Sequence, residues 1–107
     1  MPDAKIKSQG HGHYIMYKFT NKAEEAHFFI QTKGKSSGKP LKTEIPNCIG
    51  IRVNDQCLVP DYFFYVIQYL FVTGAFAQRL RGSVIPYIRH CDITEAIVNF
   101  NYERSQL

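Results

Sequence analysis

The longest apolar run of the chain covers residues 62–72 and is interrupted only by Gln68. Asp61, immediately before the run, is a suitable N-cap residue whose charge favours the positive end of a helix dipole. Gly74 is suited to the position just after a helix end. Because the run is apolar almost all round, it predicts a central, packed helix over residues 62–73.

Shorter segments are rich in aromatic and β-branched residues, which is typical of strands. Strands are expected over residues 14–19, 27–32, 48–54 and 83–88. The second has a continuous apolar centre, which predicts burial on both faces, and the third alternates, which predicts one buried face. Because Pro86 in the last segment has no amide hydrogen, that strand is expected at a sheet edge.

A second helical pattern lies near the C-terminus. Asp92 and Glu95 resemble a capping box in which Asp92 is the N-cap residue. Apolar residues then recur with helical spacing at Ile93, Ala96, Ile97 and Phe100. The pattern predicts an amphipathic C-terminal helix, and a shorter helix is expected over residues 75–80.

A chain of 107 residues with 45% hydrophobic residues is long enough for one domain with one core. The expected fold class is α+β, with a single small domain over residues 1–107. A short mixed or antiparallel sheet packs on the central apolar helix, and the amphipathic helix follows it. The polar residues 1–12 are expected to form a flexible N-terminal segment.

The cysteines favour a reducing compartment. Cys48, Cys57 and Cys91 are odd in number and have no CxxC spacing, so we expect free thiols that are buried as small apolar groups. Their spacing with His90 fits no common zinc site, and no metal or cofactor is expected. The N-terminus lacks the apolar segment of a signal peptide. A cytoplasmic protein is therefore expected.

The chain offers no convincing catalytic pair and no membrane span. His90 and Cys91 are adjacent, and adjacent residues of a strand point to opposite faces, which disfavours a Cys-His pair. No catalytic residue is therefore expected. The apolar run over residues 62–72 falls short of the roughly twenty residues that cross a bilayer, so no membrane partner is expected.

The net charge of +4 is mildly basic, and its distribution is more informative than its size. One lysine-rich segment without any acidic residue has two glycines that free the backbone and hydroxyls that can donate to an anion. Its candidate phosphate contacts are Lys33, Lys35, Ser36, Ser37, Lys39 and Lys42. The spacing is not that of a P-loop. The alternative is a solvated, flexible hairpin loop over residues 34–40.

A second basic cluster consists of Arg79, Arg81, Ser83 and Arg89. If it lies on the same face as the lysines, the two would form one phosphate-binding surface, which positions a protein on DNA without reading its sequence. The alternative is that the first two arginines only complement a helix C-terminus.

Three tyrosines of the apolar run, Tyr62, Tyr65 and Tyr69, are spaced to lie on one side of the helix. They could stack on bases or form an aromatic contact with a protein partner. The alternative is the rim of a core, with the hydroxyls reaching water.

Several motifs resemble an uncharacterised family of small standalone proteins from Bacteroides-type bacteria, whose members are often carried near mobile genetic elements. The resemblance covers roughly residues 27–92. It is carried by HFFI (27–30), SGKP (37–40), PNC (46–48) and RGSVIPYIR (81–89). The family has no assigned activity, so the resemblance implies none.

A more distant likeness points to DNA. The lysine-rich loop, PDYFFYVIQYL (60–70) and GSVIPYI (82–88) look like the C-terminal half of a target recognition domain. Such domains belong to the DNA-specificity subunits of type I restriction-modification systems. The chain lacks most of the N-terminal half and the long spacer helix, so the likeness implies DNA contact without base-specific readout.

Two hypotheses follow. The first is a non-enzymatic, DNA-binding accessory protein that contacts phosphates through the two basic clusters, with a mobile element as the setting that the family resemblance implies. The second is a protein-interaction module or homodimer that uses the tyrosine-rich helix.

Overall fold

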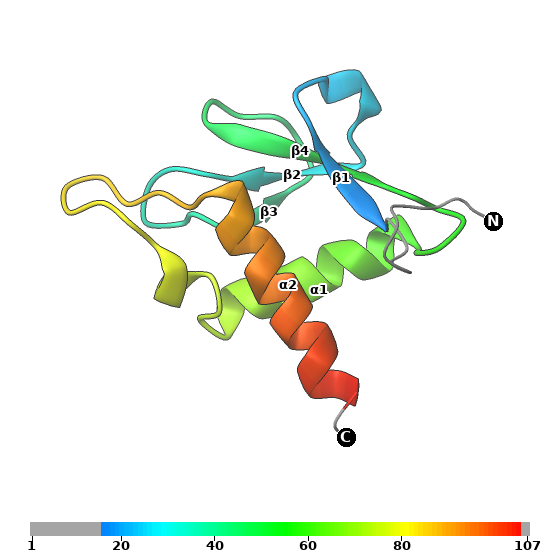
Figure 1. The fold of residues 1–107 in the computed structure, drawn as a ribbon. Coiled ribbons are helices and arrows are strands. Elements are labelled where there is room, and N and C mark those ends of the chain that lie inside the picture. The colour runs from blue at the N-terminus through cyan, green and yellow to red at the C-terminus, as the bar shows by residue number, and fades with distance from the viewer. Residues whose placement is uncertain (1–15, 106–107) are drawn as a thin grey trace.

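The computed structural model describes the backbone of residues 16–105 and the side chains of residues 16–100, and it confirms an α+β domain (Figure 1). Four strands form one sheet in the order β1-β4-β2-β3, and every neighbouring pair is antiparallel. The strands are β1 (Tyr17–Thr20), β2 (Phe28–Gln31), β3 (Pro40–Leu41) and β4 (Cys48–Val53).

The centre of the sheet is the pair β2 and β4, which the apolar patterns predict. Ile51 of β4 pairs with Phe19 of β1 on one side and Phe28 of β2 on the other. The continuous apolar centre of β2 is buried throughout, as expected, and Arg52 is the exposed residue in the alternation of β4. The short strand β3 was not expected, and the first residues of the predicted strand 14–19 lie outside the described residues.

Helix α1 (Pro60–Val72) lies beneath the sheet, and its bounds differ slightly from the prediction. Proline occupies its first turn, where a missing amide hydrogen costs nothing. Val59 is the N-cap residue, so the prediction of Asp61 as N-cap is wrong, and that carboxylate lies within the first turn instead. Gly74 follows the helix end with φ of 88°, as predicted for this position.

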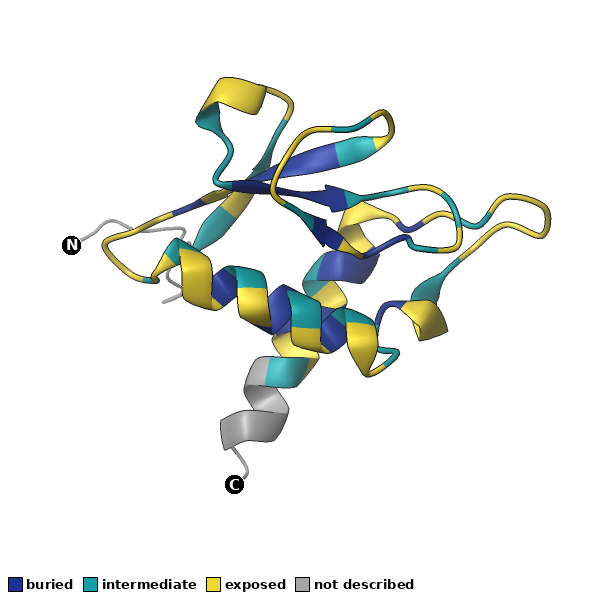
Figure 2. Cartoon of the chain, turned by 180° about the vertical axis from the view of Figure 1, so that it is seen from behind, coloured by how far each residue is buried: buried dark blue, intermediate teal, exposed yellow. Residues whose placement is uncertain are grey.

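The helix is central and packed, as predicted, but it is not buried all round. One side of α1 is buried against the sheet and the second long helix, through Phe63, Val66, Ile67 and Leu70. Exposed residues recur along the rest of its length (Figure 2). A two-layer domain of this size covers only one face of the helix, and apolar content alone does not specify how many layers exist.

The second long helix, α2 (His90–Ser105), crosses α1 on the same side of the sheet. Its inner residues Ile93, Ala96 and Ile97 are buried, which confirms the predicted amphipathic pattern. Two short 3-10 turns complete the fold, η1 (Ala23–Glu25) and η2 (Ala77–Arg79). The second replaces the longer helix expected over residues 75–80.

No strand forms over residues 83–88. Tyr87 makes isolated bridges to Arg81 and to Lys33. Residues 82–86 form the loop that connects Arg81 to Tyr87. The β-branched residues that suggested a strand therefore lie at an exposed loop end, where no partner strand is available.

The cysteines do not pack in the core. Cys57 and Cys91 are exposed and Cys48 is half-buried, all as free thiols, so the expectation of buried cysteines is wrong. Among the described residues, no helix combines the length and the apolar character required to cross a bilayer.

Candidate nucleic-acid interface

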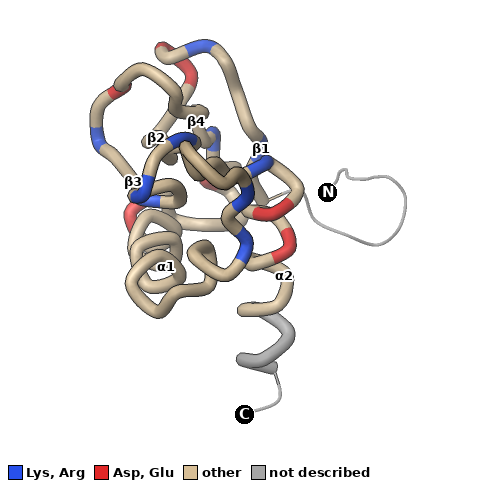
Figure 3. Tube along the Cα trace, turned by 90° about the vertical axis from the view of Figure 1, so that its left-hand side faces the viewer, with Lys and Arg blue, Asp and Glu red and all other residues tan. Residues whose placement is uncertain are grey.

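The two basic clusters lie side by side. We call residues 33–39 the lysine loop and residues 81–89 the arginine segment. The Gly34 amide donates to the Pro86 carbonyl (2.7 Å), and the Ile88 amide donates to the Thr32 carbonyl (3.0 Å). Both segments lie at the left of Figure 1, the side that faces the viewer in Figure 3. Residues about fifty positions apart thus contribute to one side of the molecule.

The lysine loop is tied to the domain by its own backbone. The Gly38 amide donates to the Gln31 carbonyl (2.8 Å), and the Gln31 amide donates to the Lys39 carbonyl (3.0 Å). Gly34 and Gly38 have φ of 96° and 100°, which glycine adopts readily. The loop is therefore a defined part of the fold.

Ser37 does not reach the surface. Its side chain is 1% exposed, and its hydroxyl donates to the Gly34 carbonyl at 2.7 Å. The hydroxyl closes the turn of the loop, so we remove Ser37 from the set of candidate phosphate contacts. Ser36 and Ser83 remain, half-buried and exposed respectively.

Three ammonium groups of the lysine loop are available. Lys33, Lys35 and Lys39 are exposed, and none forms an ion pair with any residue that the structure describes. Lys42 is placed differently, because its ammonium group lies 4.0 Å from the centre of the Phe64 ring, next to α1. It extends the basic region towards the helix.

Two arginines of the segment converge on Asp92. Arg89 donates from Nε (3.0 Å) and Nη2 (3.1 Å), and Arg81 donates from Nε at 3.4 Å. The hydrogen bonds from Arg89 lower the pKa of Asp92 well below its usual range, and Asp92 in turn raises the pKa of Arg89. One carboxylate thus faces two guanidinium groups, and the cluster keeps a positive balance.

Asp92 also caps α2, although not in the predicted position. Its Oδ2 accepts the Arg89 backbone amide at 3.1 Å, so Asp92 is the third helical residue reaching back to the helix start. The predicted capping box, with Asp92 as N-cap and Glu95 reaching back, is wrong. Glu95 instead accepts a hydrogen bond from Arg79.

Arg79 serves the fold rather than the basic surface. Its side chain is 17% exposed, Nε lies 3.0 Å from Glu95 Oε1, and Nη1 donates to the Ala75 carbonyl at 2.6 Å. This contact links the chain after α1 to α2. Arg79 is therefore no longer a candidate phosphate contact.

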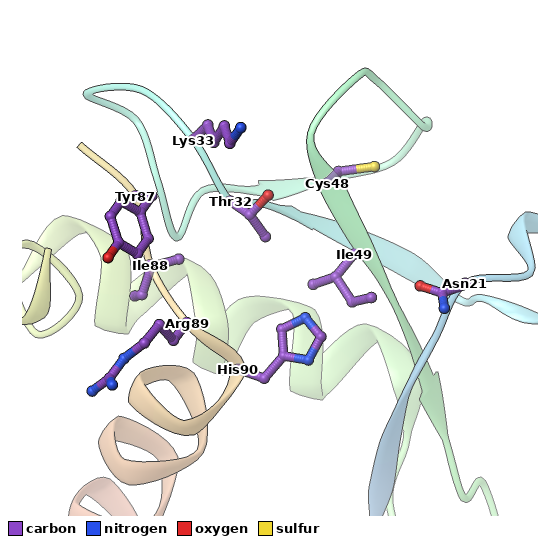
Figure 4. Close-up of a pocket in the computed structure, with 9 residues that line it drawn as sticks. All are labelled: Asn21, Thr32, Lys33, Cys48, Ile49, Tyr87, Ile88, Arg89 and His90. Atoms are coloured by element: carbon purple, nitrogen blue, oxygen red, sulfur yellow. The ribbon is translucent and has the colours of Figure 1, made fainter. Parts of the chain in front are cut away.

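A hollow of about 470 Å³ with a mixed polar and apolar lining opens between Lys33, the start of β4 and residues 87–90. Figure 4 shows Lys33 on one side of it and Arg89 and His90 on the other. The His90 ring stacks on Phe19 with ring centres 4.6 Å apart. The lining of the hollow contains no carboxylate and consists of Asn21, Thr32, Lys33, Cys48, Ile49, Tyr87, Ile88, Arg89 and His90. Lys33 and Arg89 are the cations of this lining, and Arg89 is also paired with Asp92.

Most of the hollow could not be found from the sequence. Asn21, Thr32 and Cys48 come from separate segments, and neither their types nor their spacing suggests a common site. Among the residues that line the hollow, only Lys33 and Arg89 were predicted from the sequence as phosphate contacts. Within the described residues, no group of three or more histidine, cysteine or acidic side chains is placed to hold a metal ion.

The tyrosine side of α1 is a separate exposed surface. Tyr62, Tyr65 and Tyr69 are 46%, 65% and 53% exposed, and Val59 and Val72 at the two ends are 63% and 64% exposed. The Tyr69 ring also contacts Phe100 of α2, with centres 5.7 Å apart. The prediction that the three tyrosines share one side of the helix is confirmed.

Comparison with known proteins places the chain in a family without assigned activity. The model of a family of unknown function, DUF6943, matches residues 15–106, and the chain belongs to this family. Neither the curated proteins nor the solved structures contain a significant match.

Proposed function

Because membership of this family implies no activity, we propose from the geometry that the protein is a non-enzymatic, DNA-binding protein. It contacts phosphates through Lys33, Lys35 and Lys39 of the lysine loop and Arg81 and Arg89 of the arginine segment. The single observation that carries the proposal is the backbone pairing of these two segments, which brings three exposed lysines next to two arginines that share one carboxylate. The lining of the adjacent hollow adds no negative charge.

The remaining features agree with phosphate contact rather than base readout. Lysine and serine side chains on loops hold the DNA backbone but carry no sequence information. The likeness of residues 60–88 to target recognition domains of restriction-modification systems supports the same class of partner. An accessory role on a mobile element is the cellular setting that the family resemblance suggests.

The salt dependence of DNA binding tests this proposal. Each phosphate contact contributes about −0.9 to the slope of log affinity against log salt concentration. We expect the Lys35→Ala/Lys39→Ala variant to bind duplex DNA more weakly, with a slope that is shallower by about 2 units. The measurement is fluorescence anisotropy with a duplex of about 20 base pairs between about 50 and 200 mM salt.

The matched control removes two charges from the sheet. Lys18 and Arg52 face each other across β1 and β4 and are both exposed. The Lys18→Ala/Arg52→Ala variant should keep the wild-type slope. Equal losses in the two variants would mean that only net charge matters, and absence of DNA binding at about 50 mM salt would refute the proposal.

The exposure of the tyrosine side of α1 favours a second candidate function, a homodimer. An isologous dimer brings the same surface of two copies together, and tyrosines are frequent anchors in such contacts. The stripe from Val59 to Val72 runs the length of α1 with aromatic residues at its centre. In the dimer, this stripe would be covered by the same stripe of the second copy.

The mass in solution tests the dimer. Wild-type protein should show a dimer mass by light scattering at micromolar concentration. The Tyr65→Ala/Tyr69→Ala variant should be monomeric, because both rings lie near the middle of the stripe. The Tyr87→Ala variant is the control on another surface and should remain dimeric. A wild-type monomer at all concentrations would exclude this candidate.

A further inference from the structure

The loop over residues 82–86 presents two aliphatic side chains to solvent. It is closed at its base by a pair of hydrogen bonds between Arg81 and Tyr87, each amide donating to the other residue's carbonyl at 2.9 Å. Val84 is 87% exposed and Ile85 is 63% exposed. These adjacent aliphatic side chains form an apolar tip at the end of the loop.

The loop has features that hold its shape. Gly82 has φ of 89°, and a Cβ there would lie 2.6 Å from the Ile85 carbonyl oxygen, so the chain turns back closely on itself. Pro86 fixes its own φ, and its carbonyl accepts the Gly34 amide of the lysine loop. The two aliphatic residues are therefore carried on a loop that is anchored at its base.

The surroundings of the loop identify the class of partner. Arg81 precedes it, Arg89 follows it closely, and the lysine loop is hydrogen-bonded to its base. An apolar tip between cationic groups suits a polyanion that can also accept apolar side chains. Proteins that bind the minor groove of DNA insert apolar side chains of this kind between base steps and bend the duplex.

An anionic membrane is the competing surface, and the amount of apolar area decides against it. Burying one valine or isoleucine side chain contributes about 1.5–3 kcal/mol, so two of them give weak anchoring. A DNA kink needs only one or two inserted side chains, because the cost of unstacking is a few kcal/mol per step.

We propose that Val84 and Ile85 form a wedge that enters the minor groove and inserts between base steps of DNA. The arginine segment and the lysine loop hold the phosphates on either side, and the duplex is kinked towards the major groove. This inference rests on the proposed DNA binding and adds a mode of contact and a deformation of the ligand.

The test compares binding and bending in the same samples. A duplex of about 30 base pairs that carries a dye at each end should show increased energy transfer with wild-type protein, as expected for a bend of about 20–90°. The Val84→Ser/Ile85→Ser variant should keep the salt slope but lose most of the change in transfer. The matched control, Val98→Ser, alters a valine of α2 that is 56% exposed and belongs to neither proposed binding surface, and it should bend DNA like wild type.

The outcomes separate the two proposals. Binding without bending by the wild-type protein, or equal bending by both variants, would overturn the wedge and leave DNA binding intact. No binding at low salt would overturn both. If vesicles of anionic phospholipid bind the wild type but not the Val84→Ser/Ile85→Ser variant, and DNA is not bent, the loop is a membrane contact and the wedge is refuted.

Discussion

Replacement of Gly38 by alanine is expected to lower the free energy of unfolding by about 2–5 kcal/mol. A residue with a Cβ pays about 1–2 kcal/mol for the left-handed conformation that Gly38 adopts. The added Cβ would also lie 2.6 Å from Phe76 Cδ2, and Phe76 is fully buried. Overpacking of a core costs about 1–3 kcal/mol more. Urea unfolding followed by circular dichroism measures the difference.

Gly74 separates the two contributions. It has φ of 88°, but an added Cβ would meet nothing within 4 Å. The Gly74→Ala variant should therefore lose only the conformational part, about 1–2 kcal/mol. Adding Phe76→Leu to the Gly38→Ala variant should recover part of the additional loss, because the smaller side chain gives way. Equal destabilisation by the two alanines would contradict a close contact between Gly38 and Phe76.

This contact explains why the lysine loop could not be judged from its composition. Its glycines, serines and lysines are typical of solvated loops, and nothing in them shows that Gly38 packs on the ring of Phe76, 38 residues further along the chain. Local composition predicts that a loop exists, whereas its packing depends on residues elsewhere in the chain.

The central elements could be predicted because their patterns are local. The apolar segment 27–32 and the alternation after Cys48 identify β2 and β4, and helical spacing identifies the inner face of α2. The exposed side of α1 was predicted only as two alternatives for its three tyrosines, a partner contact or the rim of a core. A run that is apolar almost all round suits a buried helix and a helix with an interaction surface equally well.

The candidate site was predictable as a list of charges but not as a surface. The lysines and arginines were visible in the sequence, yet their adjacency depends on hydrogen bonds between residues 32–34 and 86–88. Arg79 is not among the candidate phosphate contacts, because the fold pairs it with Glu95. Val84 and Ile85, whose β-branched side chains had suggested a strand, are exposed in the fold.

Replacement of Asp92 by asparagine should lower the free energy of unfolding at pH 7 by about 2–3 kcal/mol. The Asp92 side chain is 5% exposed and accepts hydrogen bonds from the Arg89 backbone, the Arg89 guanidinium and Arg81. Hydrogen bonds to a charged group contribute about 1.5–3 kcal/mol. Asparagine keeps the shape and one acceptor oxygen but leaves two guanidinium groups without a counter-charge.

The pH dependence identifies the charge as the cause. The pKa of Asp92 is lowered in the folded protein, whereas an unfolded aspartate has a pKa of about 4. Below that value the unfolded chain takes up the proton first, so protonation favours unfolding. The stability that Asp92 provides is present above about pH 4 and is lost as the pH falls towards its folded pKa. The asparagine variant lacks this titration, so the gap between the two proteins should narrow below about pH 4.

Glu95→Gln is the matched control for a carboxylate on the same helix. It removes the partner of Arg79, but the Glu95 side chain is 64% exposed, and an exposed ion pair contributes about 0–1 kcal/mol. The Glu95→Gln variant should therefore lose no more than about 1 kcal/mol of the free energy of unfolding. A gap between wild type and Asp92→Asn that stays constant from pH 7 to about pH 3 would show that the charge of Asp92 is not the cause of the loss, because only a charged carboxylate with a lowered pKa makes the gap depend on pH.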